Sequence, residues 1–259
     1  MTAEFLQAAL PARHGFFTRR GGVSRGPYAS LNGSLSGGDD PADVARNRAL
    51  AARALDTAPD RMLGVTQVHG TAVATVDTPW LPGQGPRADA LVTARPGLAL
   101  GIITADCAPV LFADPESGIV GAAHAGWRGA VAGILEATID AMLALGASRA
   151  RIHAAVGPCI AQPSYEVAAD LRDAVLAGPL PAATFFRDGR PDRWHFDLAG
   201  YCAARLRAAL PGDAVSGCAR DTVAEPDLFF SHRRRTLAGG GAIGHQMSVI
   251  ASHPGDPHG

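Results

Sequence analysis

Seven runs of apolar or β-branched residues, each of strand length, follow one another between Met62 and Ile160 and constrain the fold more than any other feature. They span residues 63–68, 72–76, 89–93, 98–104, 108–113, 119–124 and 151–157. One helical pattern, residues 130–145, stands among them and stops at Gly146. Because strands outnumber helices and do not alternate regularly with them, the sequence predicts an α+β fold with a mixed β-sheet core and flanking helices.

Further elements are predicted outside this region. Asp40 is a good N-cap, and Pro41 a good first residue, for a helix over residues 41–55. The other predicted elements are a strand in residues 14–23 that ends in a glycine turn, helices over 166–176 and 197–209, and a last strand over 246–251. No repeat or low-complexity linker divides the chain, so we expect one domain over residues 1–259, with 252–259 as a disordered tail.

All 23 positively charged side chains are arginines, because lysine is absent from the sequence. This excludes a Schiff-base lysine, a lysine general base and a P-loop lysine, and it leaves anion binding to arginine. The formal net charge is −1, and the basic cluster at residues 233–235 is only three residues long. Neither feature indicates a nucleic-acid partner.

The sequence also gives no indication of a membrane partner. No apolar run reaches the ~18–20 residues of a membrane span, and the best candidate, residues 98–112, is broken by Asp106. The N-terminus carries Glu4 and lacks the basic segment and apolar core of a secretion signal. We therefore expect a cytoplasmic protein.

Three potential metal ligands stand at the ends of predicted strands: His69, Cys107 and His124. Two imidazoles and a thiolate suit zinc, and three protein ligands leave a fourth position open, as in catalytic zinc sites. Small neighbours such as Gly70 leave room for close approach, which indicates the floor of a pocket. We expect Asp106 to cap a turn or orient a ligand rather than to bind the metal.

The same residues allow other interpretations. Cys107 could be a nucleophile activated by His124 or His69, as in a Cys–His hydrolase. The metal site could instead be structural, in a non-catalytic binding module. A blue-copper multicopper oxidase is not indicated, because its clusters rest on His-x-His pairs and the nine histidines form none. The sequence alone does not separate the first two interpretations from a catalytic zinc site.

Eleven segments along nearly the whole chain resemble, in order, the YfiH/YlmD family, long labelled laccase-domain or multicopper polyphenol oxidase proteins and now described as purine nucleoside phosphorylases. The matching segments are His-Gly-Phe-Phe-Thr-Arg-Arg-Gly-Gly-Val-Ser (14–24), Ser-Leu-Asn (30–32), Gly-Asp-Asp-Pro (38–41), Asn-Arg (47–48), Gln-Val-His-Gly (67–70), Ala-Asp-Ala (88–90), Thr-Ala-Asp-Cys-Ala-Pro-Val (104–110), His-Ala-Gly-Trp-Arg-Gly (124–129), Gly-Pro-Cys-Ile (157–160), Tyr-Glu-Val (165–167) and Phe-Phe-Ser-His-Arg-Arg (229–234).

The resemblance implies a zinc site at His69, Cys107 and His124, the same three residues. It also implies phosphorolysis of adenosine, inosine, guanosine and 5′-methylthioadenosine to base and ribose 1-phosphate, with adenosine deaminase activity. The implied partners are purine nucleosides and phosphate. The older label implies a copper-dependent polyphenol oxidase as the alternative, since His/Cys sites take zinc or copper.

Matching motifs also supply candidates for substrate contacts. Arg48, Arg128 and Arg233 are candidates for binding an anion or the substrate, with Arg48 first. Gln67 is predicted to share a strand face with His69 and to touch the base or ribose. Cys159 is interpreted as a packed thiol.

The chain departs from the family pattern near its C-terminus. It has Ile-Gly-His at residues 243–245 where the family often has Thr-Gly-Arg, so a cation there depends on pH. The segment after Cys218 also lacks the aromatic residue expected nearby. Either departure could change which nucleosides the protein prefers.

Overall fold

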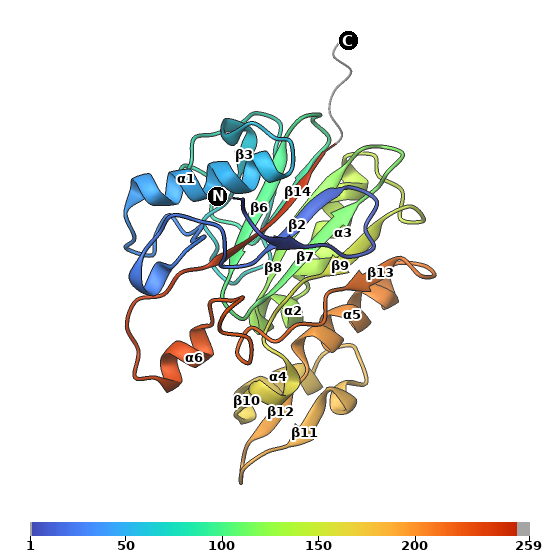
Figure 1. Ribbon diagram of the computed structural model, residues 1–259. Coiled ribbons are helices and arrows are strands. Elements are labelled where there is room, and N and C mark those ends of the chain that lie inside the picture. The colour runs from blue at the N-terminus through green and yellow to red at the C-terminus, as the bar shows by residue number, and fades with distance from the viewer. Residues whose placement is uncertain (1, 253–259) are drawn as a thin grey trace.

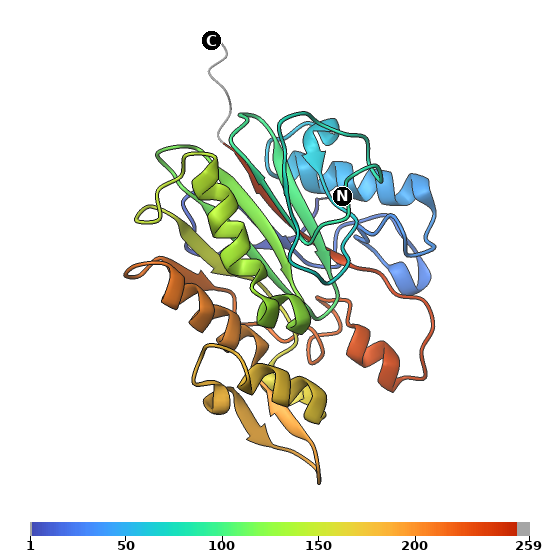
Figure 2. The ribbon, with the colours of Figure 1, turned by 180° about the vertical axis from the view of Figure 1, so that it is seen from behind.

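Two β-sheets lie against each other at the centre of the molecule, and helices cover both outer faces (Figure 1, Figure 2). The computed structural model describes residues 2–252. One sheet runs in the order β1 (Phe5–Leu6), β2 (Arg13–Phe17), β14 (Gln246–Ala251), β6 (Ala99–Thr104) and β3 (Met62–Leu63). The other runs in the order β13 (Val215–Gly217), β9 (His153–Val156), β7 (Ala108–Ala113), β8 (Val120–Ala125), β5 (Ala90–Thr93) and β4 (Val73–Thr75).

Helices and a small sheet complete the single domain. The helices are α1 (Pro41–Ala54), α2 (Trp127–Ala132), α3 (Ile134–Ala144), α4 (Ala169–Leu176), α5 (Leu198–Ala209) and α6 (His232–Leu237). The small sheet has the order β10 (Glu166–Val167), β12 (Trp194–Phe196) and β11 (Phe186–Asp188). The mixed sheets and flanking helices confirm the predicted α+β class.

Strand β7 shows why these strands are apolar on both faces. Val110 and Phe112 belong to the core shared with α3 and α5, whereas Leu111 and Ala113 belong to the core between the two sheets. A strand buried on both sides has no polar face, so its sequence is a continuous apolar run. The other outer face is covered by α1, where the Asp40 side chain accepts a hydrogen bond from the Ala42 amide at 2.8 Å, as its N-cap role predicts.

Some predicted boundaries were wrong. The helix over 130–145 is two helices, α2 and α3, because Gly133 at φ +100° ends the first. The predicted strand over 63–68 pairs with β6 only at Met62–Leu63, and Thr66 then forms an isolated bridge with Arg87. The predicted helix over 166–176 begins later, after the short strand β10. Helix α6 was not predicted.

The C-terminal strand β14 has the predicted bounds. The predicted tail falls outside the described residues except for Ser252. That residue is buried, and its hydroxyl donates to the Leu98 carbonyl at 3.0 Å, so it belongs to the fold.

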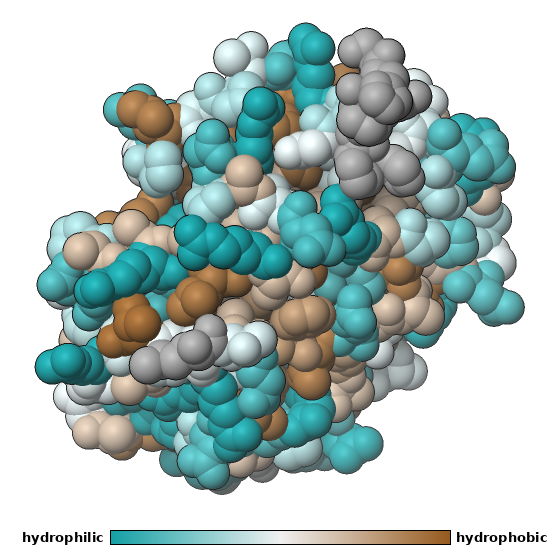
Figure 3. Space-filling model, turned by 45° about the horizontal axis from the view of Figure 1, so that its top comes forward, coloured by the Kyte–Doolittle hydropathy of each residue, from teal (hydrophilic) through white to brown (hydrophobic). Residues whose placement is uncertain are grey.

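The described helices are all too short or too polar to cross a membrane. On the face displayed in Figure 3, hydrophobic residues are interspersed with hydrophilic ones.

The crossing from one sheet to the other positions the candidate site. Strand β6 ends in the five-stranded sheet, and β7 begins four residues later in the six-stranded sheet. Ala108 at the start of β7 pairs with Ala125 at the end of β8. This register places Cys107, just before β7, beside His124 near the end of β8.

Candidate metal centre and its pocket

The side chains of His69, Cys107 and His124 converge at this end of the two sheets. Their donor atoms all lie within 4.8 Å of one another, and Cys107 Sγ is 4.0 Å from His69 Nε2. The two imidazole rings meet edge to face with centroids 4.7 Å apart. His124 is buried, Cys107 is half-buried and His69 is exposed, so the cluster opens toward solvent on the His69 side.

Asp89, just before β5, holds two of these residues in place. Its carboxylate is fully buried and lies 2.9 Å from His124 Nδ1, which leaves Nε2 of that ring free for a ligand. The same carboxylate accepts backbone N–H bonds from His69 at 2.9 Å and from Gly70 at 2.6 Å. The loop that carries His69 is therefore wrapped around Asp89, with His69 in the left-handed region at φ +60°.

Asp106 fixes the turn that presents Cys107. It has φ +93°, and its carboxylate accepts bonds from the Thr222 hydroxyl and from the Arg233 amide, both at 2.6 Å. The Asp106 carbonyl accepts a bond from the Ile160 amide at 2.9 Å. The expectation that Asp106 orients a ligand without joining the metal cluster agrees with these contacts.

The charges of the cluster favour the thiolate form of Cys107. Burial raises the pKa of this thiol, but His124 and His69 outweigh burial and lower the pKa to about 6. For His124, burial lowers the pKa, whereas the Cys107 thiolate and the Asp89 carboxylate raise it to about 9. The thiolate is the form of cysteine that binds metals.

The arrangement fits a metal ion. Two imidazole nitrogens and one sulfur form a donor set suited to zinc or copper, and their spacing is close to that around one ion with bonds of about 2.0–2.3 Å. Gly126 adds a second observation, because a Cβ there would come within 3.0 Å of the His69 ring and 3.2 Å of the Cys107 sulfur. Only glycine leaves this space beside the donors empty.

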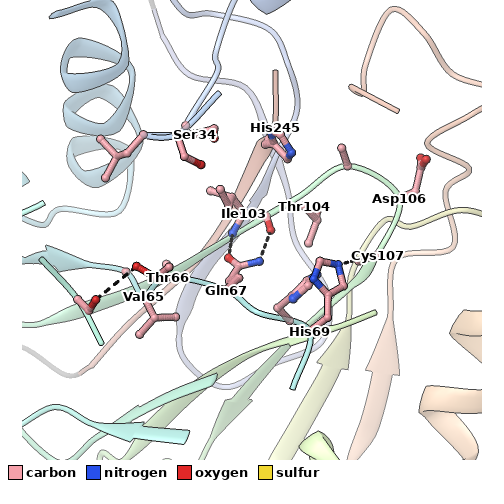
Figure 4. Close-up of a pocket in the computed structure, with 18 of the residues that line it drawn as sticks. Ser34, Val65, Thr66, Gln67, His69, Ile103, Thr104, Asp106, Cys107 and His245 are labelled. Carbon is pink, nitrogen blue, oxygen red and sulfur yellow. Dashed lines mark hydrogen bonds between the residues drawn. The ribbon is translucent and has the colours of Figure 1, made fainter. Parts of the chain in front are cut away.

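The cluster lies in the wall of a cavity of about 670 Å³, which is the size of a small-molecule site. Figure 4 shows the donors His69 and Cys107 at one end of this pocket and Ser34 and His245 at the other, with Thr104 between them. The aromatic side chains Trp80, Trp127 and Tyr165 also line it.

Gln67 lines the pocket but does not lie on a strand beside His69, which corrects the prediction. Its side-chain amide donates to the Ile103 carbonyl at 2.8 Å and accepts from the Ile103 amide at 2.9 Å (Figure 4). The side chain thus replaces the backbone pairing that a continued strand would make. These two bonds hold the His69 loop against β6, and the second N–H of the amide leaves the predicted contact with the base or ribose as a proposal.

The three candidate arginines are placed differently. Arg48 and Arg233 line the pocket, whereas Arg128 is exposed, stacks on Trp127 at 4.4 Å and is absent from the lining. Arg233 donates to the Glu166 carbonyl at 2.9 Å, a structural contact. Cys159 is buried, and burial raises the pKa of its thiol, as expected for a packed cysteine.

His245 gives a pH-dependent prediction. Burial, together with the nearby His232, His124 and Arg235, lowers the pKa of His245 to about 4 from its ordinary value of 6.5. Between these values the unfolded chain binds the proton and the folded chain does not, so stability falls as the pH drops from 6.5 toward 4.

We expect the stability advantage of the wild type over His245→Asn to shrink by roughly 1–3 kcal/mol between pH 7 and pH 4. Urea unfolding of both proteins in phosphate-free buffer measures it. A difference that stays constant with pH would contradict the prediction.

Comparison with known proteins identifies the family to which this chain belongs. A family model described as multi-copper polyphenol oxidoreductase laccase matches residues 13–253. The chain belongs to this family. Among solved structures, this chain is similar to YlmD from Geobacillus stearothermophilus. The TM-score is 0.84 and the sequence identity 32%, and the match covers 97% of this chain and 99% of that one. A Neisseria meningitidis protein has the same TM-score and 37% identity, covering 96% and 99%.

Several curated relatives of this chain are named purine nucleoside phosphorylases. One from Deinococcus radiodurans is 46% identical over 245 residues, which are 93% of this chain and 89% of the relative. One from Streptomyces coelicolor is 51% identical over 172 residues, which are 66% of this chain and 71% of the relative. The predicted family resemblance is thereby confirmed.

Asp89 is a residue of the site that was given no role from the sequence. It lies in Ala-Asp-Ala, one of the matching segments. An acidic residue between alanines at the start of a buried strand is itself a signal, since a carboxylate there needs several hydrogen-bond donors. Ser34, in a loop, and Thr104, at the end of β6, also line the pocket, and neither was given a role from the sequence.

Proposed function

We propose that this protein is a zinc-dependent purine nucleoside phosphorylase. One observation carries the proposal: the three-donor cluster opens into a cavity of about 670 Å³ in a chain whose relatives bear this name. Adenosine, inosine, guanosine and 5′-methylthioadenosine are the proposed substrates, with phosphate as the second substrate. Adenosine deamination is the proposed side activity.

The chemistry of phosphorolysis defines what the pocket must do. An oxygen of phosphate attacks C1′ of the ribose, the C1′–N9 bond breaks, and its electron pair goes to the purine, which takes up a proton. Positive charge develops on the ribose meanwhile, so the phosphate must be held in line with the breaking bond. The aromatic side chains of the lining offer flat faces for the purine.

His69, Cys107 and His124 would hold the metal, and Asp89 would fix the orientation of His124. A zinc ion bound there supplies Lewis acidity and a water nucleophile at neutral pH, the chemistry that deamination requires. Arg48 is the first side chain proposed to hold the anion, because it lines the pocket and its guanidinium is buried, and Arg233 and Arg128 are the further candidates.

Inosine with and without phosphate tests the function. We expect the zinc-loaded protein to release hypoxanthine and ribose 1-phosphate only when phosphate is present, in a preparation free of host phosphorylase. The same preparation is assayed with adenosine for ammonia release, and its zinc and copper are quantified. Absence of turnover of every purine nucleoside would refute the proposal, and bound copper with oxygen uptake on phenols would replace it with the oxidase.

The Cys–His hydrolase interpretation is tested with the same preparation. Cys107 is 4.0 Å from His69 Nε2, so the pair could act without a metal. A metal-free wild type that reacts rapidly with a thiol reagent at Cys107 and cleaves an amide would favour it. A bound metal that protects Cys107 from the reagent supports the phosphorylase.

A further inference from the structure

Unpaired polar atoms gather at the end of the pocket away from the cysteine. Among residues 2–252, five buried side-chain nitrogen or oxygen atoms have no hydrogen-bond partner, and three of them belong to lining residues. These are Ser34 Oγ, Thr104 Oγ1 and His245 Nδ1. Ser34 and Thr104 are each only 2% exposed. A buried polar group without a partner is costly, so three in one pocket point to a ligand that completes them.

Backbone contacts hold these three residues next to one another. The Gly33 amide donates to the His245 carbonyl at 3.0 Å, which places the loop carrying Ser34 beside His245. Thr104 pairs across the sheet with Gln246, the residue after His245. Figure 4 shows the resulting order, with Ser34 and His245 together and Thr104 between them and His69.

Arg48 gives this end of the pocket its charge. Its guanidinium donates to the Gly33 carbonyl at 3.3 Å, one residue from Ser34. Within residues 2–252 it forms no ion pair with a carboxylate, although burial lowers its pKa to about 10. An arginine has five N–H donors, so most of them remain available for an anion.

We propose that Ser34, Arg48, Thr104 and His245 form the subsite for orthophosphate, an inference that rests on the proposed phosphorolysis. Two hydroxyls, a guanidinium and an imidazole can all donate to phosphate oxygens, and the guanidinium balances part of the charge. A ribose hydroxyl would leave that charge without a counter-ion. Because Thr104 is the member of the subsite on the side toward His69, a phosphate here faces a nucleoside bound beside the metal cluster.

The KM for phosphate is the quantity that tests the subsite. In the zinc-loaded enzyme, Ser34→Ala and Thr104→Val should each raise the KM for phosphate by about 10- to 100-fold, because each removes a hydrogen bond to a charged group. The KM for inosine should change by less than about threefold. Thr66→Val is the matched control: Thr66 lines the same pocket, but its hydroxyl already donates to the Gly85 carbonyl.

Inosine 5′-monophosphate distinguishes free phosphate from the phosphate of a nucleotide. If the subsite binds orthophosphate, the nucleotide gains no more than about twofold in affinity over inosine. If the nucleotide binds much more tightly than inosine, and Ser34→Ala removes that preference without changing the KM for orthophosphate, the proposal is overturned. A rise in the KM for inosine alone would overturn it too, because the subsite would then bind ribose.

Direct binding separates this inference from the proposed function. Equilibrium dialysis of radiolabelled phosphate against the zinc-loaded protein, without nucleoside, should show binding to the wild type and to Thr66→Val and its loss in Ser34→Ala and Thr104→Val. That result would support the subsite even if no nucleoside were cleaved. Phosphorolysis with an unchanged KM for phosphate in both variants would leave the function standing and refute the subsite.

Discussion

Cys107→Ala is expected to lose its bound metal and, with it, more than about 100-fold of the phosphorolysis rate. The cluster has three protein donors, and the substitution removes the only sulfur among them. The two remaining imidazoles bind a metal ion more weakly than the full set of three donors. The wild type should contain about one metal ion per chain, and the variant much less than a tenth of one. Elemental analysis and the inosine assay, run on the same preparations, measure both quantities.

Cys202→Ala is the matched control for this prediction. Cys202 is also a free cysteine, but it is fully buried and lies in α5 among core residues, outside the pocket lining. It should keep metal and activity while losing some stability from the smaller side chain. Full metal content in Cys107→Ala would place the metal elsewhere. A metal-free Cys107→Ala protein with normal turnover would show that the reaction does not use this cluster.

The central strands of the two sheets could be predicted because burial on both faces leaves a simple pattern, whereas the short edge strands β1 and β13 were not predicted. Strand β7 is apolar at every position, and its predicted and observed bounds agree. Strand β3 could not be bounded in this way. Its apolar run continues, but the Gln67 side chain pairs with Ile103 and ends the ladder, a tertiary contact that no local pattern records.

The residues of the metal cluster could be predicted from the sequence, but the contacts that hold them in position could not. Two histidines and a cysteine are visible as residue types with metal chemistry, and the structure brings them together. What holds them depends on contacts between distant segments, such as the carboxylate of Asp89 on the His69 loop and on His124, 35 residues further along. Arg128 shows what a motif leaves open, since it follows the lining residue Trp127 but its own side chain is exposed and stacks on that ring.

Asp89→Asn should weaken metal binding by about 10- to 100-fold and lower the free energy of unfolding by roughly 3–5 kcal/mol. The fully buried carboxylate accepts from the His69 and Gly70 amides and pairs with His124. An asparagine keeps the shape, but it loses the charge and turns an N–H donor toward groups that also donate. Competition with a chelator measures metal affinity, and urea unfolding measures stability.

Asp114→Asn is the matched control, because it shows what the loss of a buried carboxylate does away from the metal cluster. Asp114 is equally buried, and its carboxylate accepts from the Ser148 amide at 2.8 Å and from Arg151 at 3.0 Å, outside the lining of the metal pocket. Both variants should lose stability, but only Asp89→Asn should lose metal affinity. If both kept the wild-type affinity, Asp89 would be a support of the fold alone. If both weakened binding equally, the loss would follow from destabilisation and not from the orientation of His124.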